Sequence, residues 1–97
     1  MKVGIVLATR ADFPTAQAIA LAARRARHQV AIFVMDAGCH ALAAEPATAA
    51  ALLDADCEIT VCSNSAAGLD LGDGITRGSQ DDHAAVLATS DRVIALT

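Results

Sequence analysis

The chain has 97 residues, of which 55% are hydrophobic and only 2% aromatic, and its formal net charge is −4. This length predicts one domain over residues 1–97, because there is no room for a second hydrophobic core. The acidic balance argues against a nucleic-acid groove or a surface that binds anionic membranes, so neither partner is expected.

The N-terminal part of the chain predicts a strand followed by a helix. Residues 2–8 are almost continuously apolar, as in a strand that is covered on both faces. The helix begins near Asp12 and Pro14, since a capping residue and a proline suit a first turn. It ends near Arg24, Arg25 and Arg27, which we interpret as solvated side chains that complement the helix dipole.

The remaining segments continue this alternation. They are a strand at 29–35, a loop at 36–40, an alanine-rich helix opened by Glu45-Pro46 and ending near Asp54, a strand at 57–62, a glycine-rich excursion at 63–78, a helix from the capping box at 79–82 to about 89, and a strand at 92–96. Strands that alternate with helices predict an α/β fold, with a parallel sheet of about four to five strands between helices in flavodoxin-like layering. Sites in such sheets gather at the carboxyl ends of the strands, which here are followed by residues 8–14, 36–40 and 62–78.

Several kinds of site are excluded by the residues in these loops. The first loop has no glycine, which argues against a dinucleotide fingerprint and a phosphate-binding P-loop. A cysteine phosphatase loop needs an arginine six residues after its cysteine, but Gly68 occupies that place relative to Cys62. Cys39, His40, Cys57 and Cys62 contain no CxxC or HxxxH pair, so no metal site is predicted.

The three cysteines differ in the places that they occupy. Side chains alternate across a strand, so Cys57 and Cys62 face opposite ways and a disulfide between them is not expected. Cys57 is interpreted as a small core residue. Cys39 lies beside His40 in a predicted loop, where we interpret it as an exposed, incidental thiol; a resolving or relay thiol is the alternative, with His40 as a secondary candidate.

Cys62 stands at the predicted carboxyl end of a strand and is followed by small residues. The backbone amides of Ser63, Asn64, Ser65 and Ala66, with the polar side chains among them, are candidates for stabilising a thiolate at Cys62. From position alone, a reactive thiol and a small core residue are equally well supported. Peroxide sensing through a sulfenic acid is a further possibility for such a thiol.

Several segments taken together resemble the DsrE/DsrF-like sulfur-relay proteins, which include the TusD-type subunits. They are Val3-Gly-Ile-Val-Leu7, Ile32-Phe-Val-Met-Asp-Ala-Gly38, Ile59-Thr-Val-Cys62 with its small-residue loop, Gly78-Ser79, and Ser90-Asp-Arg-Val-Ile94. The resemblance spans essentially the whole chain. Ile59 to Cys62 is similar to the strand that ends in the family's sulfur-accepting cysteine.

The resemblance implies a parallel sheet flanked by helices, and a function. It implies that Cys62 is the catalytic residue, which accepts sulfane sulfur as a persulfide and passes it to a partner thiol without a cofactor. It also implies sulfur-donor and acceptor proteins as partners, and assembly as a homotrimer, a homohexamer or a subunit of a hetero-oligomer. The alternative is a non-catalytic assembly or ligand-binding module of the same fold.

We expect a cytoplasmic protein. The apolar run at the N-terminus is too short for a secretion signal and is followed by Arg10 and Asp12. No segment approaches the ~20 apolar residues of a membrane-spanning helix. Three cysteines in a reducing compartment are expected to be free thiols.

Overall fold

The computed structural model describes all 97 residues, which form five strands and four helices. In chain order these are β1 (Lys2–Leu7), α1 (Phe13–Arg25), β2 (Gln29–Val34), α2 (Ala37–Ala44), α3 (Pro46–Asp54), β3 (Glu58–Cys62), β4 (Thr76–Gly78), α4 (Gln80–Thr89) and β5 (Arg92–Leu96). None of the helices has the length and apolar character needed to cross a membrane.

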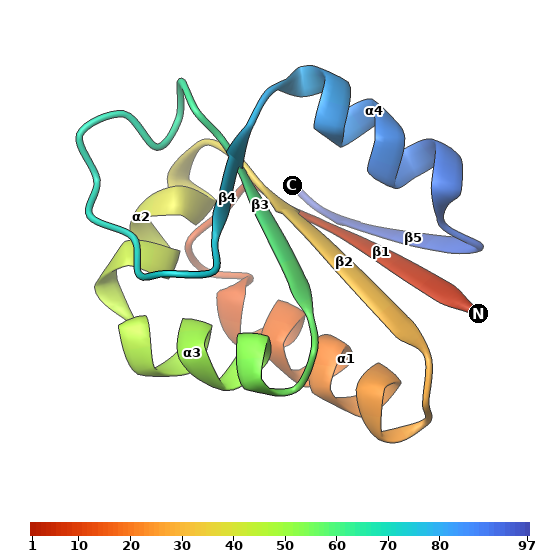
Figure 1. Cartoon of the computed structure of the whole chain (residues 1–97). Coiled ribbons are helices and arrows are strands. Elements are labelled where there is room, and N and C mark those ends of the chain that lie inside the picture. Colours follow the sequence, from red (N-terminus) through yellow and green to blue (C-terminus); the bar gives the residue numbers. More distant parts are fainter.

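All five strands are parallel and form one sheet in the order β4-β3-β2-β1-β5 (Figure 1). The predicted α/β fold, with a parallel sheet of about four to five strands, is therefore confirmed. Because the strands run in the same direction, the carboxyl ends of β2, β3 and β4 lie at the same end of the sheet. The turn at Asp36, the loop after Cys62 and the start of α4 are found at this end.

The two faces of the sheet are covered unequally. Helices α1, α2 and α3 lie on one face, and α4 alone lies on the other (Figure 1). Alternate residues of each strand therefore enter two different environments. On β3, Ile59 and Val61 join the large core beneath the three helices, whereas Cys62 joins a small cluster with Phe33 and Val86 beneath α4.

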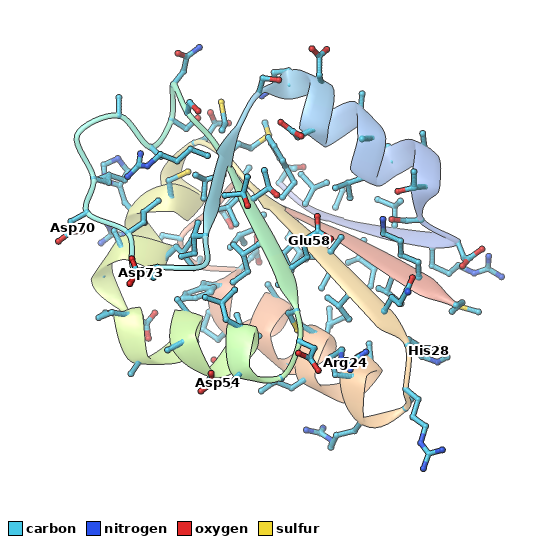
Figure 2. The ribbon with its side chains drawn as sticks, in the orientation of Figure 1. Arg24, His28, Asp54, Glu58, Asp70 and Asp73 are labelled. Atoms are coloured by element: carbon cyan, nitrogen blue, oxygen red, sulfur yellow. The ribbon has the colours of Figure 1, made fainter.

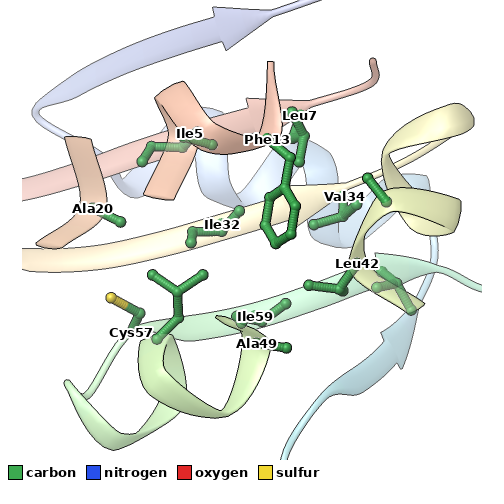
Figure 3. Close-up of a cluster of buried hydrophobic side chains, with 14 of the residues drawn as sticks. Ile5, Leu7, Phe13, Ala20, Ile32, Val34, Leu42, Ala49, Cys57 and Ile59 are labelled. Carbon is green, nitrogen blue, oxygen red and sulfur yellow. The ribbon is translucent and has the colours of Figure 1, made fainter. Parts of the chain in front are cut away.

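The large core is built from aliphatic side chains, one phenylalanine and two cysteines. Ile5 on β1 and Ile32 on β2 pack beneath Phe13, which opens α1, and Leu42 of α2 closes the same layer (Figure 3). All four side chains are at most 3% exposed. Alanines such as Ala20 face this layer from α1, so the helix axis lies close to the sheet.

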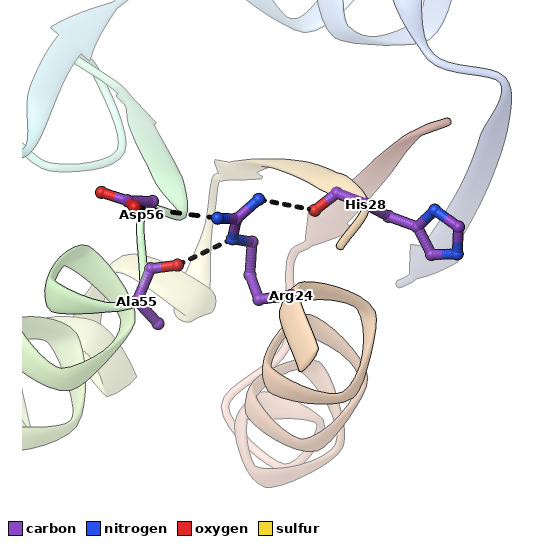
Figure 4. A network of polar contacts seen from close by, with 4 residues as sticks. All are labelled: Arg24, His28, Ala55 and Asp56. Atoms are coloured by element: carbon purple, nitrogen blue, oxygen red, sulfur yellow. Dashed lines mark hydrogen bonds and ion pairs between the residues drawn. The ribbon is translucent and has the colours of Figure 1, made fainter. Parts of the chain in front are cut away.

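The C-terminal end of α1 is attached to the turn that precedes β3. Arg24 donates from Nε to the Ala55 carbonyl and from Nη1 to the His28 carbonyl, both at 2.8 Å, and its Nη2 lies 3.7 Å from the Asp56 carboxylate (Figure 4). The interpretation of Arg24 as a merely solvated side chain is therefore wrong. Its two carbonyl contacts link the helix end to two turns of the chain.

Local signals at the helix ends have mixed outcomes. Asp12 occupies the N-cap position of α1, but its side chain makes no capping hydrogen bond. At the start of α4, Ser79 and Asp82 form both halves of a capping box, as predicted from the sequence. This cap fixes where the chain leaves β4 and turns into α4.

Two predicted irregular segments contain regular structure. The segment 36–40 is not a loop, because α2 begins at Ala37, directly after a turn at Asp36 with φ of 52°. Gly38 makes this possible, since a Cβ there would lie 2.7 Å from the Leu7 carbonyl oxygen. The segment 63–78 ends in β4, which pairs with β3 and extends the sheet.

Candidate functional site

Cys62 is the last residue of β3, and it lies on the face of the sheet that only α4 covers. In the parallel register, Cys62 is the partner of Gly78, the last residue of β4. The chain then passes through Ser79 into α4, so the first turn of that helix stands beside the cysteine. Two elements far apart in the sequence therefore meet at this sulfur.

The surface beside Cys62 is hollowed. The hollow has a volume of about 390 Å³ and is lined by Cys62, Ser63, Asn64, Gly78, Ser79, Gln80 and Asp82. Cys62 is 6% exposed. Cys62 is thus a buried residue that borders an open hollow, and the other lining residues are polar or glycine.

Hydrogen bonds favour the ionised form of the Cys62 thiol. The backbone N–H of Ser65 lowers the pKa of Cys62 most, and the Ser65 hydroxyl acts in the same direction. Partial burial raises this pKa, while the backbone N–H of Asn64 and the side chain of Gln80 lower it further, and the net pKa is below the ordinary value. A lowered pKa gives more thiolate, which is the nucleophilic form of cysteine.

The four residues predicted to stabilise an anion do not all face the sulfur. Ser63 donates both its N–H and its hydroxyl to the Gly78 carbonyl, at 2.9 and 2.8 Å. The N–H of Ala66 is bound to the Cys62 carbonyl at 2.9 Å. The hydrogen-bond donors of this loop that are available to the sulfur are therefore those of Asn64 and Ser65. Of the four residues predicted to stabilise a thiolate, Ser63 and Ala66 use their donors elsewhere.

The loop after Cys62 is held in place by Arg77 of β4. Arg77 donates from Nη1 to the Ala66 carbonyl at 3.1 Å and from Nη2 to the Leu69 carbonyl at 2.6 Å. An arginine fork can hold two carbonyl oxygens at once. The turn that contains Ser65 is thus attached to the neighbouring strand β4.

Gln80 is a contact of Cys62 that the sequence analysis did not identify. Its Nε2 lies 3.7 Å from the Cys62 Sγ, and its Oε1 lies 3.0 Å from Nδ1 of His83, one turn further along α4. The ring of His83 stacks on the buried ring of Phe33 from β2, with centroids 5.0 Å apart and an interplanar angle of 8°. No local sequence pattern identifies Gln80, because its place beside Cys62 follows from the pairing of β4 with β3 in the folded sheet.

The secondary candidates lie elsewhere. Cys39 is completely buried in the core beneath the helices, where its Sγ donates to the Val34 carbonyl at 3.5 Å. Burial raises the pKa of Cys39 to about 11. The interpretation of Cys39 as an exposed thiol is therefore wrong, and its neighbour His40 is exposed on α2. Cys57 is 3% exposed in the same core, and all three cysteines are free.

A second groove, of about 370 Å³, lies between α3 and the loop before β4. Its lining includes aliphatic side chains such as Leu42 and Leu53 and three aspartates. Asp54 lies on α3, and Asp70 and Asp73 lie on the loop (Figure 2). No cysteine, histidine or basic residue lines it. The groove has no nucleophile aimed into it, so the hollow at Cys62 is the candidate site.

Comparison with known proteins agrees with the fold. The family model for the DsrE/DsrF-like family matches residues 1–96. The crystal structure of the YchN protein from E. coli is similar to the chain with a TM-score of 0.83 over 99% of each chain, at 17% sequence identity. Among curated proteins, none is significantly similar to the chain in sequence. The likeness to YchN supports the fold, and the family match supplies a class of function.

Proposed function

Because the chain belongs to the DsrE/DsrF-like family of sulfur-relay proteins, we propose that it carries sulfane sulfur as a persulfide on Cys62 and passes it to a partner thiol. The observation that supports this role is the environment of the Cys62 sulfur. Cys62 borders an open hollow, Gln80 contacts its sulfur, and hydrogen-bonding groups of Ser65, Asn64 and Gln80 lower the pKa of its thiol. The other two thiols have neither property.

The chemistry consists of two exchange steps that are balanced in atoms and electrons. The Cys62 thiolate attacks the outer sulfur of a donor persulfide, R–S–SH, so a new S–S bond forms on Cys62 and the donor leaves as the thiolate R–S⁻. An acceptor thiolate then attacks the outer sulfur of Cys62–S–SH and releases the Cys62 thiolate. Sulfane sulfur moves without net oxidation or reduction, so the relay needs no metal or organic cofactor.

The donors on Ser65 and Asn64 suit both steps. In the first step Cys62 reacts as a thiolate, and in the second step it leaves as one. A thiol with a lowered pKa is both more ionised at neutral pH and a better leaving group. A strongly basic thiolate would accept sulfur but release it slowly. A moderately lowered pKa is therefore the property that a carrier requires.

The proposed partners are sulfur-donor and acceptor proteins, within the cytoplasm. The proposal includes assembly as a homotrimer, a homohexamer or a subunit of a hetero-oligomer. Two exposed apolar side chains, Leu87 on α4 at 46% and Val93 on β5 at 39%, are consistent with further burial in an assembly. Native mass spectrometry measures the stoichiometry directly.

Intact-mass spectrometry tests the carrier role. After incubation with glutathione persulfide and removal of excess donor, the parent protein should gain the mass of one sulfur atom. The Cys62→Ser variant should gain none, while Cys39→Ser and Cys57→Ser should behave as the parent does. A parent protein that gains no sulfur, or gains it only on Cys39, would refute the proposal.

A non-catalytic assembly or ligand-binding module is the alternative, and the 6% exposure of Cys62 is the observation that favours it. In that case Cys62 is a small side chain that fills space beneath α4. The native protein would then react with iodoacetamide as slowly at Cys62 as at Cys57, and only unfolding would accelerate the reaction. Peptide mapping of the alkylated protein separates the two functions.

A further inference from the structure

The side-chain amide of Gln80 lies between the reactive sulfur and a histidine ring. Its nitrogen end is 3.7 Å from the Cys62 Sγ, and its oxygen end is 3.0 Å from Nδ1 of His83. Gln80 and His83 are three residues apart on α4, so they share one face of the helix. The result is a chain of polar contacts that runs from the sulfur through an amide to an imidazole.

The hydrogen-bond capacity of each group decides which atoms donate and which accept in this series of contacts. A thiolate only accepts, so the amide must present its N–H end to the sulfur. The Gln80 oxygen then accepts from Nδ1 of His83, and this requires that Nδ1 carries a proton. If the amide were turned around, its oxygen would face the thiolate and the two negative ends would repel each other. The proton on Nδ1 therefore selects the orientation that supports the thiolate.

The imidazole is itself held by the core. His83 lies parallel to the ring of Phe33 at 5.0 Å between centroids, and Phe33 is 0% exposed in the centre of the sheet. Stacking on a fixed ring restricts the rotation of the histidine. The capping box at Ser79 fixes the first turn of α4, from which Gln80 projects. Gln80 and His83 are thus both attached to rigid elements.

We propose that His83 is a positioning residue for the sulfur chemistry, which acts through Gln80 by holding the amide with its N–H toward Cys62. Gln80 is then a residue that touches the reacting atom, and His83 acts through it. This inference rests on the proposed function in one respect, because the thiolate that the amide supports is the nucleophile and leaving group of sulfur transfer. The geometry of the three side chains is independent of any sulfur donor.

Two substitutions of His83 separate the hydrogen bond from the stacking. His83→Phe keeps an aromatic ring against Phe33 but has no ring nitrogen. His83→Asn loses the ring, but its side-chain N–H₂ takes the place of Nδ1–H. Gln80→Met keeps the length of the side chain and removes its donor, and it serves as the reference for a lost contact.

The first readout is the thiolate absorbance of Cys62 against pH, with the Cys62→Ser protein subtracted. We expect the titration of His83→Phe and of Gln80→Met to shift to higher pH, with about threefold less thiolate at neutral pH, the size expected for one weak hydrogen bond. His83→Asn should titrate close to the parent. The double variant with Phe and Met should shift no further than Gln80→Met alone, since both changes remove the same contact.

The second readout is the ¹⁵N chemical shift of the His83 ring in the parent protein, which reports which nitrogen carries the proton. The proposal expects a protonated Nδ1. A neutral ring with its proton on Nε2 overturns it, and this measurement does not depend on whether any variant folds. A normal titration for His83→Phe together with a shifted one for His83→Asn would also overturn it, because the stacking alone would then matter. Neither readout uses a sulfur donor, so failure of the carrier role is seen separately, as the absence of a mass gain in the parent.

Discussion

Removal of the Ser65 hydroxyl should have opposite effects on the reactivity of Cys62 at neutral and at alkaline pH. In Ser65→Ala the backbone N–H of residue 65 remains, and only the side-chain hydrogen bond that lowers the pKa of Cys62 is lost. A hydrogen bond to a charged group contributes roughly 1.5–3 kcal/mol, and sulfur is a weak acceptor, so we use the lower end of this range. About 1.5 kcal/mol corresponds to about a tenfold loss of thiolate at neutral pH.

The lost hydrogen bond also makes the remaining thiolate more reactive. With a Brønsted coefficient of about 0.4–0.5, a tenfold increase in basicity raises the rate constant of the thiolate about threefold. The two effects combine to make Ser65→Ala about threefold slower than the parent at neutral pH. At strongly alkaline pH, where Cys62 is ionised in both proteins, the variant should be about threefold faster.

The assay is the rate of thiol–disulfide exchange with dithiodipyridine, followed by absorbance over a range of pH. Ser63→Ala is the matched control, because Ser63 lines the same hollow but donates its hydroxyl to the Gly78 carbonyl. Its pH profile should coincide with that of the parent. If Ser65→Ala changes the rate by the same factor at every pH, the hydroxyl controls access and not ionisation, and the reasoning is refuted.

Two further predictions concern Arg77 and Cys39. Lysine keeps the charge of Arg77 but cannot hold the carbonyls of Ala66 and Leu69 together, so in Arg77→Lys the local stability of the loop should fall by about 1.5 kcal/mol. The Ala66 amide should then exchange its hydrogen about tenfold faster, while exchange of the Ile32 amide in β2 is unchanged. Equal protection of the Ala66 amide in both proteins would contradict this role of Arg77. The pKa of Cys39 is raised from 9.0 to about 11, so the folded state binds the proton of this thiol more tightly than the unfolded state does. The resulting contribution to the stability of the fold is present below pH 9 and is lost as the pH rises through 11. The free energy of unfolding by urea should therefore fall by about 2 kcal/mol more in the parent than in Cys39→Ala between pH 9 and pH 11, and equal slopes would show that burial of this thiol has no such effect.

The elements with strong apolar patterns were predictable, and the polar connections between them were not. The strand at Lys2 is almost entirely apolar, and the capping box at Ser79 is a local signal, so both were identified from the sequence. The short strand around Arg77 has three residues and an exposed or half-buried pattern, so nothing in its own composition marks it as a strand. Its pairing with β3 depends on the tertiary structure.

Helix α2 was missed for a different reason. Gly38 in its first turn is typical of a loop, and no side chain caps the helix. The structure uses that glycine for close approach to the Leu7 carbonyl, which is a contact between distant parts of the chain. The error about Cys39 has the same origin, because this residue lies in the first turn of α2 and is buried, whereas a loop residue was expected to be exposed.

The sequence indicated where the candidate site lies, at Cys62, but only part of what surrounds the sulfur. The alternation of side chains along β3 was enough to separate Cys62 from Cys57. The contribution of Gln80 depends on the register Cys62–Gly78, which no local pattern specifies. Likewise, which N–H groups reach the sulfur depends on the course of a turn whose other donors, such as that of Ala66, are bound to the backbone.

The sorting of thiols between the two faces of the sheet has a practical consequence for biophysical work. Cys39 and Cys57 are shielded by three helices, whereas Cys62 opens into a hollow on the thinly covered side. If Cys62 is the reactive thiol of the proposed function, a thiol-specific reagent should label the unmodified, folded chain at Cys62 ahead of Cys39 and Cys57. A fluorophore or spin label attached in this way would then report from the carboxyl end of β3, with Cys39 and Cys57 left in place.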